Sequence, residues 1–482
     1  MVKRFKARGV IMPKIDVSFM DLKWLIGKEI ELEDLKERGI LFVKGEIDKV
    51  EDDRLKIDIK DTNRPDLWSA EGIARELKGY YGIERGLKKY EIKKANVKVI
   101  VNENVSNIRP YIVGAIVKGV YFNDETIKQI IQLQEKICQT YGRGRRDIAI
   151  GVYDFSKIVQ PIHYKAVRPN SISFIPLDFE KELTLSEILR LHPKGKEYGH
   201  LLKGFDRYPL LIDSAGNVLS MPPIINSQLT GKVDEETRDV FIDITGNNLE
   251  RMKIALNIIV TALADRGGMI YSIDVEYKNK VITVPDLKAK EFILNPEQCR
   301  KILGVKLSND EITRLLRMHR CDAKVKQGKI LIKYPAYRND IMDERDIIED
   351  VAISCDYNNL PINEPRIVCM GKSKLIERFS NLVRSIMIGF GFQEILNFIL
   401  TSKEKQKIFG INNLVEIDNP VSSEHNVMRS WLLPGILDFL GKNKKARYPH
   451  MVFEIGDCVI IDKSVNEKTR DERRLACAIV SN

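Results

Sequence analysis

Strand-like and helix-like segments alternate along most of this chain, and that alternation limits the folds open to it. Residues 55–60 (LKIDIK) alternate apolar and polar side chains as a half-buried strand does, and residues 61–82 turn at 63–66 into an amphipathic helical pattern. Further along, β-rich runs such as YIVGAIVKGV and VFIDIT are interspersed with helical runs at 125–142, 183–192 and 249–268. Over 482 residues without an internal repeat, this pattern predicts several α/β and α+β domains.

Breaks in the pattern predict where these domains begin and end. An N-terminal α/β module (1–90) runs into the charged stretch 86–96, which predicts a linker. A mixed α/β domain (97–278) follows, and then a unit at 284–360 whose order of helix, helix, strand and helix is typical of a small winged-helix-like domain. Residues 367–482 are again α/β and stop after the strand-like LACAIV, so we expect this last domain to be truncated.

Composition argues against several classes of protein. The net charge of +10 suits a partner that carries phosphates, but it is moderate. Seven scattered cysteines without a C-x-x-C pair predict reduced, mostly buried thiols and neither a disulfide framework nor a zinc site. The longest apolar run (254–264) is too short to cross a bilayer, and the basic start lacks a signal-peptide core. We therefore expect a soluble, cytoplasmic protein with no membrane partner.

Three familiar catalytic motifs are incomplete or missing in the sequence. Gly371-Lys372-Ser373 imitates the end of a phosphate-binding loop, but Arg366 stands where the first glycine is required. Neither a G-x-S-x-G elbow nor an H-E-x-x-H pair occurs in the sequence. These observations favour neither a nucleophilic triad nor a zinc hydrolase.

One loop concentrates arginines between glycines. In YGRGRRDIAIG (141–151), Arg143, Arg145 and Arg146 could grip a phosphate backbone, because guanidinium groups pair with phosphates in a bidentate manner. A solvated loop with no partner explains the same pattern, and the residues alone do not choose between the two.

An acidic segment, YRNDIMDERDIIEDVA (337–352), contrasts with the basic balance of the chain. Its carboxylates are Asp340, Asp343, Glu344, Asp346, Glu349 and Asp350. If a helix begins near Asp343, then Asp346, Glu349 and Asp350 share one face, with Arg345 placed to pair with Glu349, and Asp340 could fold back from the preceding turn. Acids at a helix start gain about 0.3–1 kcal/mol, so a helix start with an acidic face is favoured over a Mg²⁺ site on the residues alone. A glycosidase-type acid pair is not indicated.

Several long stretches resemble one family in their order along the chain. They are DTNRPDLWSAEGIAREL (61–77), MPPIINSQLTGKV (221–233) with VFIDITG (240–246), YPAYRNDIMDERDIIEDVA (334–352) and IDNPVSSEHNVMRSWLLPGIL (417–437). Through them, residues 12–482 resemble the beta subunit of phenylalanyl-tRNA synthetase, of the archaeal and eukaryotic type. A chain shortened at its C-terminus is expected from this resemblance.

The resemblance implies partners and a metal. A beta subunit of this family pairs with an alpha subunit in an α₂β₂ tetramer and contacts tRNA-Phe, while the alpha subunit binds ATP and attaches phenylalanine. The family holds Mg²⁺ with a D-x₅-D-x-x-E-[DE] arrangement, which is met here by Asp340, Asp346, Glu349 and Asp350. On this ground the resemblance favours a Mg²⁺ site over the helix-start explanation.

The resemblance also implies a proofreading (editing) domain at 97–278 that hydrolyses tyrosine wrongly attached to tRNA-Phe. The family's pocket positions match Leu211, Ser220, Asp243 and Thr245. A phenylalanine pocket cannot strongly exclude an analogue that adds one hydroxyl, so a second, hydrolytic site must recognise that hydroxyl. No general base is obvious, which predicts a water positioned by the pocket and the tRNA end.

The last region resembles a class II synthetase domain that lacks catalytic residues. The F-R-x-E signature of an active class II enzyme is missing, and Val452 stands two residues before Glu454. The alternatives left open are a tRNA-binding structural subunit without editing, and a free-standing editing hydrolase. The second conflicts with the large synthetase-like C-terminal region.

Overall fold

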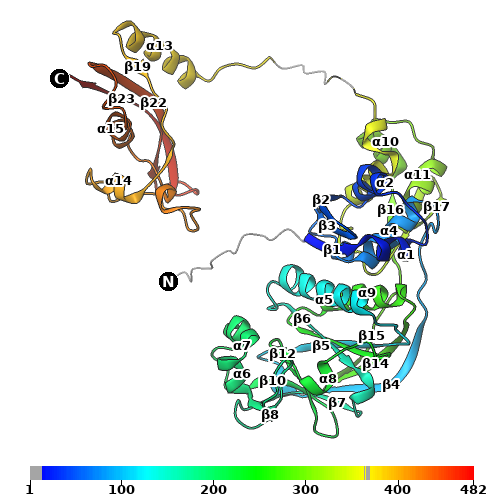
Figure 1. Cartoon of the computed structure of the whole chain (residues 1–482). Coiled ribbons are helices and arrows are strands. Elements are labelled where there is room, and N and C mark those ends of the chain that lie inside the picture. The colour runs from blue at the N-terminus through cyan, green and yellow to red at the C-terminus, as the bar shows by residue number, and fades with distance from the viewer. Residues whose placement is uncertain (1–13, 363, 365–369, 482) are drawn as a thin grey trace. The chain divides into compact units, whose positions relative to one another are not determined.

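The computed structural model describes residues 14–362, 364 and 370–481. They fall into two compact units, one within Val10–Ile362 and one within Asn363–Asn482, and each is described by itself (Figure 1). The sheets and helices of both units confirm the predicted class, a multidomain mixture of α/β and α+β folds.

The first unit begins with a small three-stranded module. Its antiparallel sheet has the order β1-β3-β2, and the predicted strand and helix near 55–60 and 61–82 are confirmed as β3 and α4. The elements are β1 (Lys14–Ser18), α1 (Phe19–Ile26), α2 (Leu32–Asp34), α3 (Ile40–Phe42), β2 (Gly45–Glu51), β3 (Arg54–Ile59) and α4 (Ala70–Tyr80). Ser69 starts α4 by accepting a hydrogen bond from the Gly72 amide (3.2 Å).

Helix α4 differs from the amphipathic helix that its sequence predicts, because its charged residues are also buried. Glu71, Arg75 and Glu76 are each no more than 4% exposed. Arg75 pairs with Asp265 (2.6 Å) and Glu71 with Arg266, both from a distant part of the chain. Ion pairs with these residues take the place of solvent on the polar side of the helix.

A ten-stranded sheet forms the largest part of the unit. Its order is β12-β11-β10-β7-β4-β14-β5-β13-β6, with β15 paired to β14. The strands are β4 (Ile92–Val101), β5 (Tyr111–Lys118), β6 (Ile148–Asp154), β7 (Ile162–Val167), β10 (Tyr208–Ile212), β11 (Val218–Met221), β12 (Ile225–Asn226), β13 (Val240–Gly246), β14 (Met269–Tyr277) and β15 (Lys280–Val284). Strand β4 begins inside the charged stretch 86–96, so that stretch is not the simple linker that its composition predicts.

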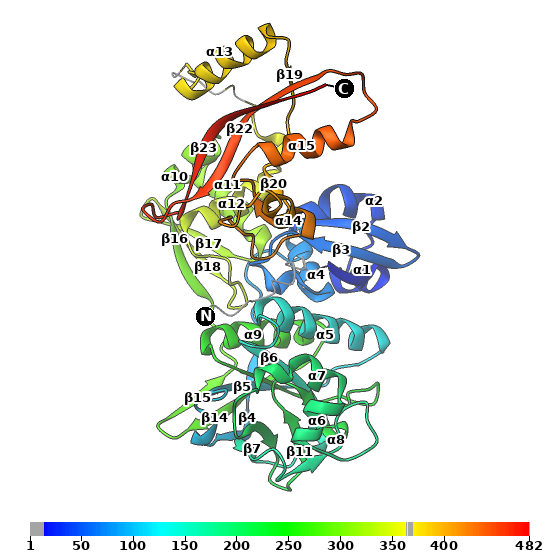
Figure 2. The ribbon, with the colours of Figure 1, turned by 90° about the vertical axis from the view of Figure 1, so that its left-hand side faces the viewer.

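Helices and a short strand pair surround this sheet. They are α5 (Asp124–Lys136), α6 (Leu185–Leu191), α7 (Pro193–Tyr198), α8 (Gln228–Gly231), α9 (Leu249–Asp265) and the pair β8 (Ser173–Phe174) and β9 (Leu183–Thr184). The predicted helical runs at 125–142, 183–192 and 249–268 are thereby confirmed, the first ending in a π-helical turn at Ile137–Tyr141. Figures 1 and 2 show α5 and α9 between the ten-stranded sheet and the N-terminal module.

The third part of the unit has the order strand, two helices, two strands and helix. It comprises β16 (Lys290–Leu294), α10 (Pro296–Leu303), α11 (Asn309–Leu316), β17 (Asp322–Lys326), β18 (Lys329–Tyr334) and α12 (Glu344–Cys355). Strands β16 and β17, which the sequence pattern did not predict, flank β18 in an antiparallel sheet. KEFIL (β16) does not alternate polar and apolar residues, whereas DAKVK (β17) does over five residues and is a strand signal that the sequence analysis missed.

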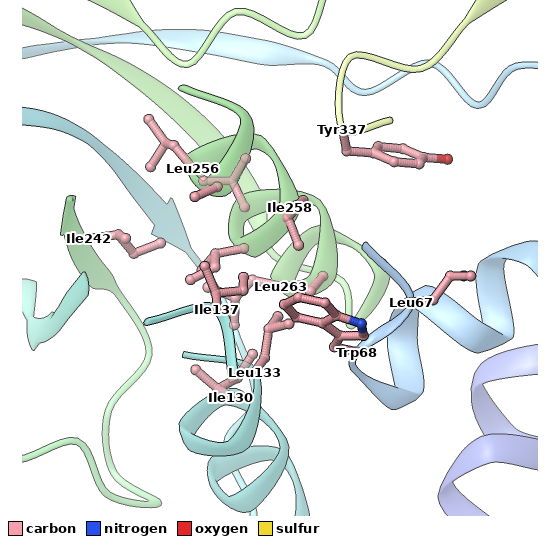
Figure 3. Packing of buried hydrophobic residues seen from close by; sticks show 14 of the residues in the cluster. Leu67, Trp68, Ile130, Leu133, Ile137, Ile242, Leu256, Ile258, Leu263 and Tyr337 are labelled. Atoms are coloured by element: carbon pink, nitrogen blue, oxygen red, sulfur yellow. The ribbon is translucent and has the colours of Figure 1, made fainter. Parts of the chain in front are cut away.

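One apolar core joins all three parts of this unit. A continuous cluster of buried residues runs from Ile15 in β1 to Val351 in α12. Figure 3 shows Trp68, which precedes α4, beside Leu133 of α5 and Leu263 of α9. The domain boundaries predicted near 90 and 284 remain predictions, since buried side chains on both sides of each boundary share this core.

The second unit is built on two long antiparallel strands, β22 (His450–Ile461) and β23 (Thr469–Val480). Its other elements are α13 (Leu375–Gly389), β19 (Gln393–Glu394), β20 (Leu400–Thr401), α14 (Lys403–Lys407), β21 (Val427–Met428) and α15 (Leu433–Lys442). The strands predicted from MVFEIGD and LACAIV are confirmed.

The described cysteines agree with the prediction of mostly buried, reduced thiols except at one position. Cys138, Cys299, Cys321 and Cys458 are buried free thiols and Cys355 is half-buried, but Cys477 is exposed on β23, contrary to the prediction of a core position; Cys369 lies outside the described residues.

Among the helices of the described ranges, none is both long and apolar enough to cross a membrane.

Candidate functional site

A cavity of about 480 Å³ lies where the two ends of the ten-stranded sheet approach each other. Strand β6 stands at one end of the strand order and β11 near the other, yet Tyr153 of β6 places its hydroxyl 2.9 Å from Ser220 Oγ of β11. Asn226 of β12 also donates to the Val152 carbonyl of β6 (3.3 Å). The sheet therefore curls upon itself around the cavity, whose volume is in the range of small-ligand pockets, about 300–1,000 Å³.

Three of the four predicted pocket residues line this cavity. Ser220, Asp243 and Thr245 are in its wall, and each is no more than 2% exposed. Leu211 pairs with Ser220 across β10 and β11, but it is buried in the apolar core and is not among the lining residues. The cavity places a group of polar side chains against walls formed largely by apolar residues of α5 and by Ile224.

Asp243 is the most perturbed of these residues. Burial raises the pKa of its carboxyl to about 7, although the Tyr153 hydroxyl and the nearby Arg109 act to lower it. Tyr153 donates to Asp243 Oδ1 at 2.5 Å, and burial beside this carboxylate raises the pKa of the Tyr153 phenol. Within the described ranges no hydrogen bond reaches Asp243 Oδ2, so this oxygen can accept one from a ligand.

A glycine on the neighbouring strand β6 leaves room for this pair. Asp243 lies opposite Gly114 of β5 and Gly151 of β6. A Cβ atom at Gly151 would lie 2.4 Å from Asp243 Oδ1 and 2.1 Å from the Tyr153 hydroxyl, closer than real side chains approach. The glycine in the sequence IAIGVYD therefore permits a buried carboxylate and a buried phenol to meet.

Arg109 holds Thr245, which lines the cavity, in place. Its guanidinium is buried and donates to Thr245 Oγ1 (2.8 Å), to the Thr245 carbonyl (2.5 Å) and to the Arg146 carbonyl (3.1 Å). Among the described residues no carboxylate lies within 4.0 Å of it, and burial lowers its pKa. Arg109 and Tyr153 were missed by the sequence analysis; a lone arginine in an apolar stretch and a Gly-x-Tyr in a strand were the only signals.

The arginine loop lies at the edge of the cavity. Arg145 lines it, donates to the carbonyls of Pro223 (3.2 Å) and Ile224 (2.8 Å), and stacks over the Tyr198 ring at 4.3 Å. Arg143 and Arg146 instead expose their side chains beside Asp147. Residues 143–145 all have positive φ, a strained conformation for two arginines, and strain of this kind is concentrated at functional sites.

The predicted metal ligands have other partners in this structure. The helix starts where predicted, with Asp343 as the cap of α12, and Asp346 accepts from the amides of Met342 and Asp343 (both 2.7 Å). Glu349 pairs with Lys44 of the N-terminal module (2.8 Å) and not with Arg345, as its spacing had suggested. The pair with Lys44 forms because Lys44 also bonds Asp61 (2.5 Å), which holds the lysine in place beside Glu349.

Asp340 and Asp350 share one buried guanidinium. Arg338 donates from Nε to Asp340 (2.8 Å) and from Nη2 to Asp350 (3.0 Å). Burial opposes ionisation of Asp340, but Arg338 and Arg64 lower its pKa to about 2. Over the residues that the structure describes, no group of three or more acidic, histidine or cysteine side chains converges on a common point that could hold a metal. This arrangement does not fit a magnesium ion, and the Mg²⁺ site stays a prediction from the resemblance.

In the second unit, Glu454 of the class II-like strand β22 binds other side chains of the protein. Glu454 is fully buried and accepts from Arg429 (2.5 Å) and from the Asn397 side chain (2.7 Å). Arg429 also donates to the Asp457 carbonyl (2.9 Å). Both Glu454 oxygens are thus engaged within the protein, which agrees with the missing F-R-x-E signature.

Comparisons with known proteins place this architecture among aminoacyl-tRNA synthetase subunits. Residues 292–357 match the tRNA synthetase B5 domain, and residues 360–482 match the phenylalanyl tRNA synthetase beta chain CLM domain. The chain belongs to the family of phenylalanine–tRNA ligase beta subunits, which confirms the resemblance found in the sequence motifs.

Individual relatives cover nearly the whole chain. The beta subunit of Pyrococcus horikoshii is 48% identical over 475 residues, which are 97% of this chain and 85% of that protein. The one from Methanocaldococcus jannaschii is 41% identical over 478 residues, covering 98% and 86%. The crystal structure of an N-terminal fragment of the Pyrococcus horikoshii beta subunit superposes with a TM-score of 0.69 at 52% identity, covering 71% of this chain and 99% of the fragment.

The raised pKa of Asp243 predicts a pH-dependent stability. The native state holds this proton more tightly than the unfolded chain, so the stabilisation is complete below pH about 4 and is lost as the pH rises towards 7. At about 1.4 kcal/mol per pKa unit, the free energy of unfolding of the native protein should fall by about 3 kcal/mol relative to that of Asp243→Asn between pH 5 and 8.

Urea denaturation at several pH values measures this difference. Asp124→Asn, which removes an exposed carboxylate of the same domain, provides the background. Parallel pH profiles of the native protein and Asp243→Asn would contradict the assigned environment.

The shared guanidinium predicts a large effect of Arg338→Ala. The substitution leaves Asp340 and Asp350 buried without it, which should lower the free energy of unfolding by about 3–5 kcal/mol. Arg345→Ala, at an exposed position of the adjoining helix, should change it by less than about 0.5 kcal/mol. Equal and small losses in both variants, measured by urea denaturation, would show that Arg338 does not hold the acidic segment.

Proposed function

We propose that this chain works as the beta subunit of a phenylalanine–tRNA ligase and that its cavity hydrolyses tyrosine from mischarged tRNA-Phe. The observation that supports the editing role best is the Tyr153–Asp243 pair, buried in the wall of an otherwise largely apolar cavity. An alpha subunit would bind ATP and attach phenylalanine, in an assembly for which we keep the α₂β₂ stoichiometry as part of the proposal. Glu454, engaged by Arg429 and Asn397, supports a structural role for the class II-like unit of this chain.

Asp243 Oδ2, to which no described residue donates a hydrogen bond, gives the cavity a means of recognising tyrosine. Since Tyr153 already satisfies Oδ1, the phenol of a bound tyrosyl group can donate to Oδ2, with Ser220 Oγ close to the same polar group. A phenylalanyl group offers no donor, and leaving a buried acceptor unpaired costs about 1–3 kcal/mol. The site would therefore bind tyrosyl esters in preference to phenylalanyl esters, which is the direction that proofreading needs.

Hydrolysis in this proposal adds water to the ester carbonyl carbon. The ester C–O bond breaks, tyrosine leaves as a free acid, and the terminal ribose of the tRNA regains its hydroxyl. Thr245, held by Arg109, lines the cavity, as does Arg145 of the arginine loop. The exposed Arg143 and Arg146 of the same loop are available to phosphates of the tRNA end. Asp243, with a pKa of about 7, exists in both protonation states near neutrality.

Deacylation of Tyr-tRNA-Phe tests this function. The full chain should hydrolyse Tyr-tRNA-Phe faster than Phe-tRNA-Phe, and Asp243→Ala should lower kcat/KM for the tyrosyl ester at least about tenfold because the acceptor for the phenol is lost. Asp124→Ala serves as the matched control, since Asp124 is an exposed carboxylate of the same domain away from the cavity lining.

Two outcomes would contradict the proposal in different ways. Full deacylation by Asp243→Ala would remove this cavity as the site, and the absence of deacylation by the native chain would favour a structural subunit that binds tRNA without editing. Formation of Phe-tRNA-Phe by the chain without an alpha subunit would contradict the division of labour between the subunits.

A further inference from the structure

A second cavity, of about 550 Å³, lies elsewhere in the first unit and is separate from the candidate editing site. Residues 87–90, which connect α4 to β4, form one wall, and the three-stranded sheet β16-β18-β17 with residues 335–337 forms another. The Leu87 amide donates to Asp322 of β17 (3.1 Å), which fixes the connecting segment against the sheet. The cavity is thus built by two segments more than 230 residues apart, and the apparent linker of the sequence analysis is one of its walls.

Strand register shows that the outer face of this sheet is basic. Asp322 lies opposite Lys333, Lys324 opposite Leu331, and Lys326 opposite Lys329, so these alternate residues share one face. The intervening residues Ile330, Ile332 and Tyr334 are buried in the core. Lys324, Lys326, Lys329 and Lys333 therefore share with Leu331 a sheet face that includes part of the cavity wall, and β16 adds Glu291 and Ile293 to the same face.

The charges at the cavity are only partly neutralised. Lys88 pairs with buried Asp265 (2.8 Å), and Lys333 pairs with Glu291 (3.0 Å). Lys89 and Lys324 are both exposed and have no carboxylate within 4.0 Å among the residues that the structure describes. Asp322, the acidic residue of the lining, already accepts from the Leu87 amide.

Beneath this basic rim the lining is mainly apolar and aromatic. It includes Leu87, Leu287, Ala289, Leu331 and Pro335. Tyr90 also lines the cavity, and its hydroxyl donates to Asp265 (2.9 Å), so its ring is what remains for a ligand. A ligand that complements the whole cavity has a flat, weakly polar part and an anionic part, since unpaired lysines attract phosphates and aromatic or apolar surfaces accept a base.

From this combination we propose that the cavity binds a nucleoside phosphate, as an unpaired nucleotide of tRNA. Its phosphates lie against Lys89 and Lys324, and its base enters the apolar part near Ala289 and Tyr90. The choice of tRNA as the source rests on the proposed function, whereas the class of ligand rests on the cavity itself. The site lies outside the candidate editing pocket, so it contributes to holding the tRNA and not to hydrolysis.

Charge reversal at the rim tests the phosphate contacts. In filter binding of tRNA-Phe to the full chain, Lys89→Glu/Lys324→Glu should weaken binding at least about tenfold. The slope of log K against log salt should decrease in magnitude by about 1.4, because each single-strand phosphate contact contributes about 0.7. The matched control is Lys301→Glu/Lys306→Glu, which reverses two exposed lysines of the same domain outside the cavity lining and should leave the slope unchanged.

A neutral variant tests the cavity as distinct from its charge. Ala289→Trp fills the apolar part, so tRNA binding should weaken at least about fivefold while the salt slope stays as in the native chain. Thermal melting of each variant checks that it is folded. Titration with AMP, followed by calorimetry, separates the possible sources. If Ala289→Trp abolishes AMP binding but leaves tRNA binding unchanged, the ligand is a free nucleotide, which would contradict tRNA as the source.

The results that overturn the inference are equally defined. Equal tRNA binding by the native chain and both cavity variants, with no AMP binding, would overturn it and leave an acidic protein as the alternative partner of this face. Equal weakening in the control pair would show a general effect of charge. Deacylation is measured in parallel. If the cavity variants bind tRNA more weakly but keep the maximal deacylation rate at saturating tRNA, the result supports this second site. If the native chain neither binds nor deacylates tRNA, the result contradicts the proposed function itself.

Discussion

A buried carboxylate, Asp243, sets the conditions for the rest of the candidate site. Taking this group out of water raises its pKa to about 7, and the Tyr153 hydroxyl at 2.5 Å and the nearby Arg109 offset that cost only in part. The two side chains meet because Gly151 leaves space on the adjacent strand β6. The curl of the sheet also brings the Tyr153 hydroxyl of β6 to Ser220 of β11. An apolar residue at position 243 would avoid this cost, and strongly shifted pKa values of this kind cluster at functional sites, which makes Asp243 the leading candidate for one.

The same unit contains a second group of charges, part of it buried, around the acidic segment 337–352. Arg338 holds Asp340 and Asp350 at the start of α12, and Lys44 of the N-terminal module holds Glu349. The Lys44–Glu349 pair reaches from the acidic segment to the first module, alongside the apolar core that both share. Of the four acids whose spacing matches a metal motif, Glu349 thus connects the acidic segment to the first module, while Asp340 and Asp350 bind Arg338 within the segment.

Local pattern was enough to predict much of the fold and part of the site. Helix α12 begins at the predicted cap because Asp343 and Asp346 form a local capping box, and Ser220, Asp243 and Thr245 were found through motif resemblance. Tyr153 and Lys44 could not be found in this way, because their partners lie 90 and 305 positions away in the sequence. The burial of charges on α4 was missed for the same reason, since only the folded chain brings Asp265 and Arg266 to that helix.

The most direct test of the central claim is the affinity of the cavity for stable mimics of its substrate. Calorimetry would compare tyrosyl- and phenylalanyl-adenosine analogues, in which an amide replaces the ester, on the full chain and on Asp243→Ala. Recognition of the hydroxyl by Asp243 predicts roughly 5- to 150-fold tighter binding of the tyrosyl analogue, as expected for about 1–3 kcal/mol from one buried acceptor, and no preference in the variant. Equal affinities for the native chain, or a preference that survives in Asp243→Ala, would contradict it.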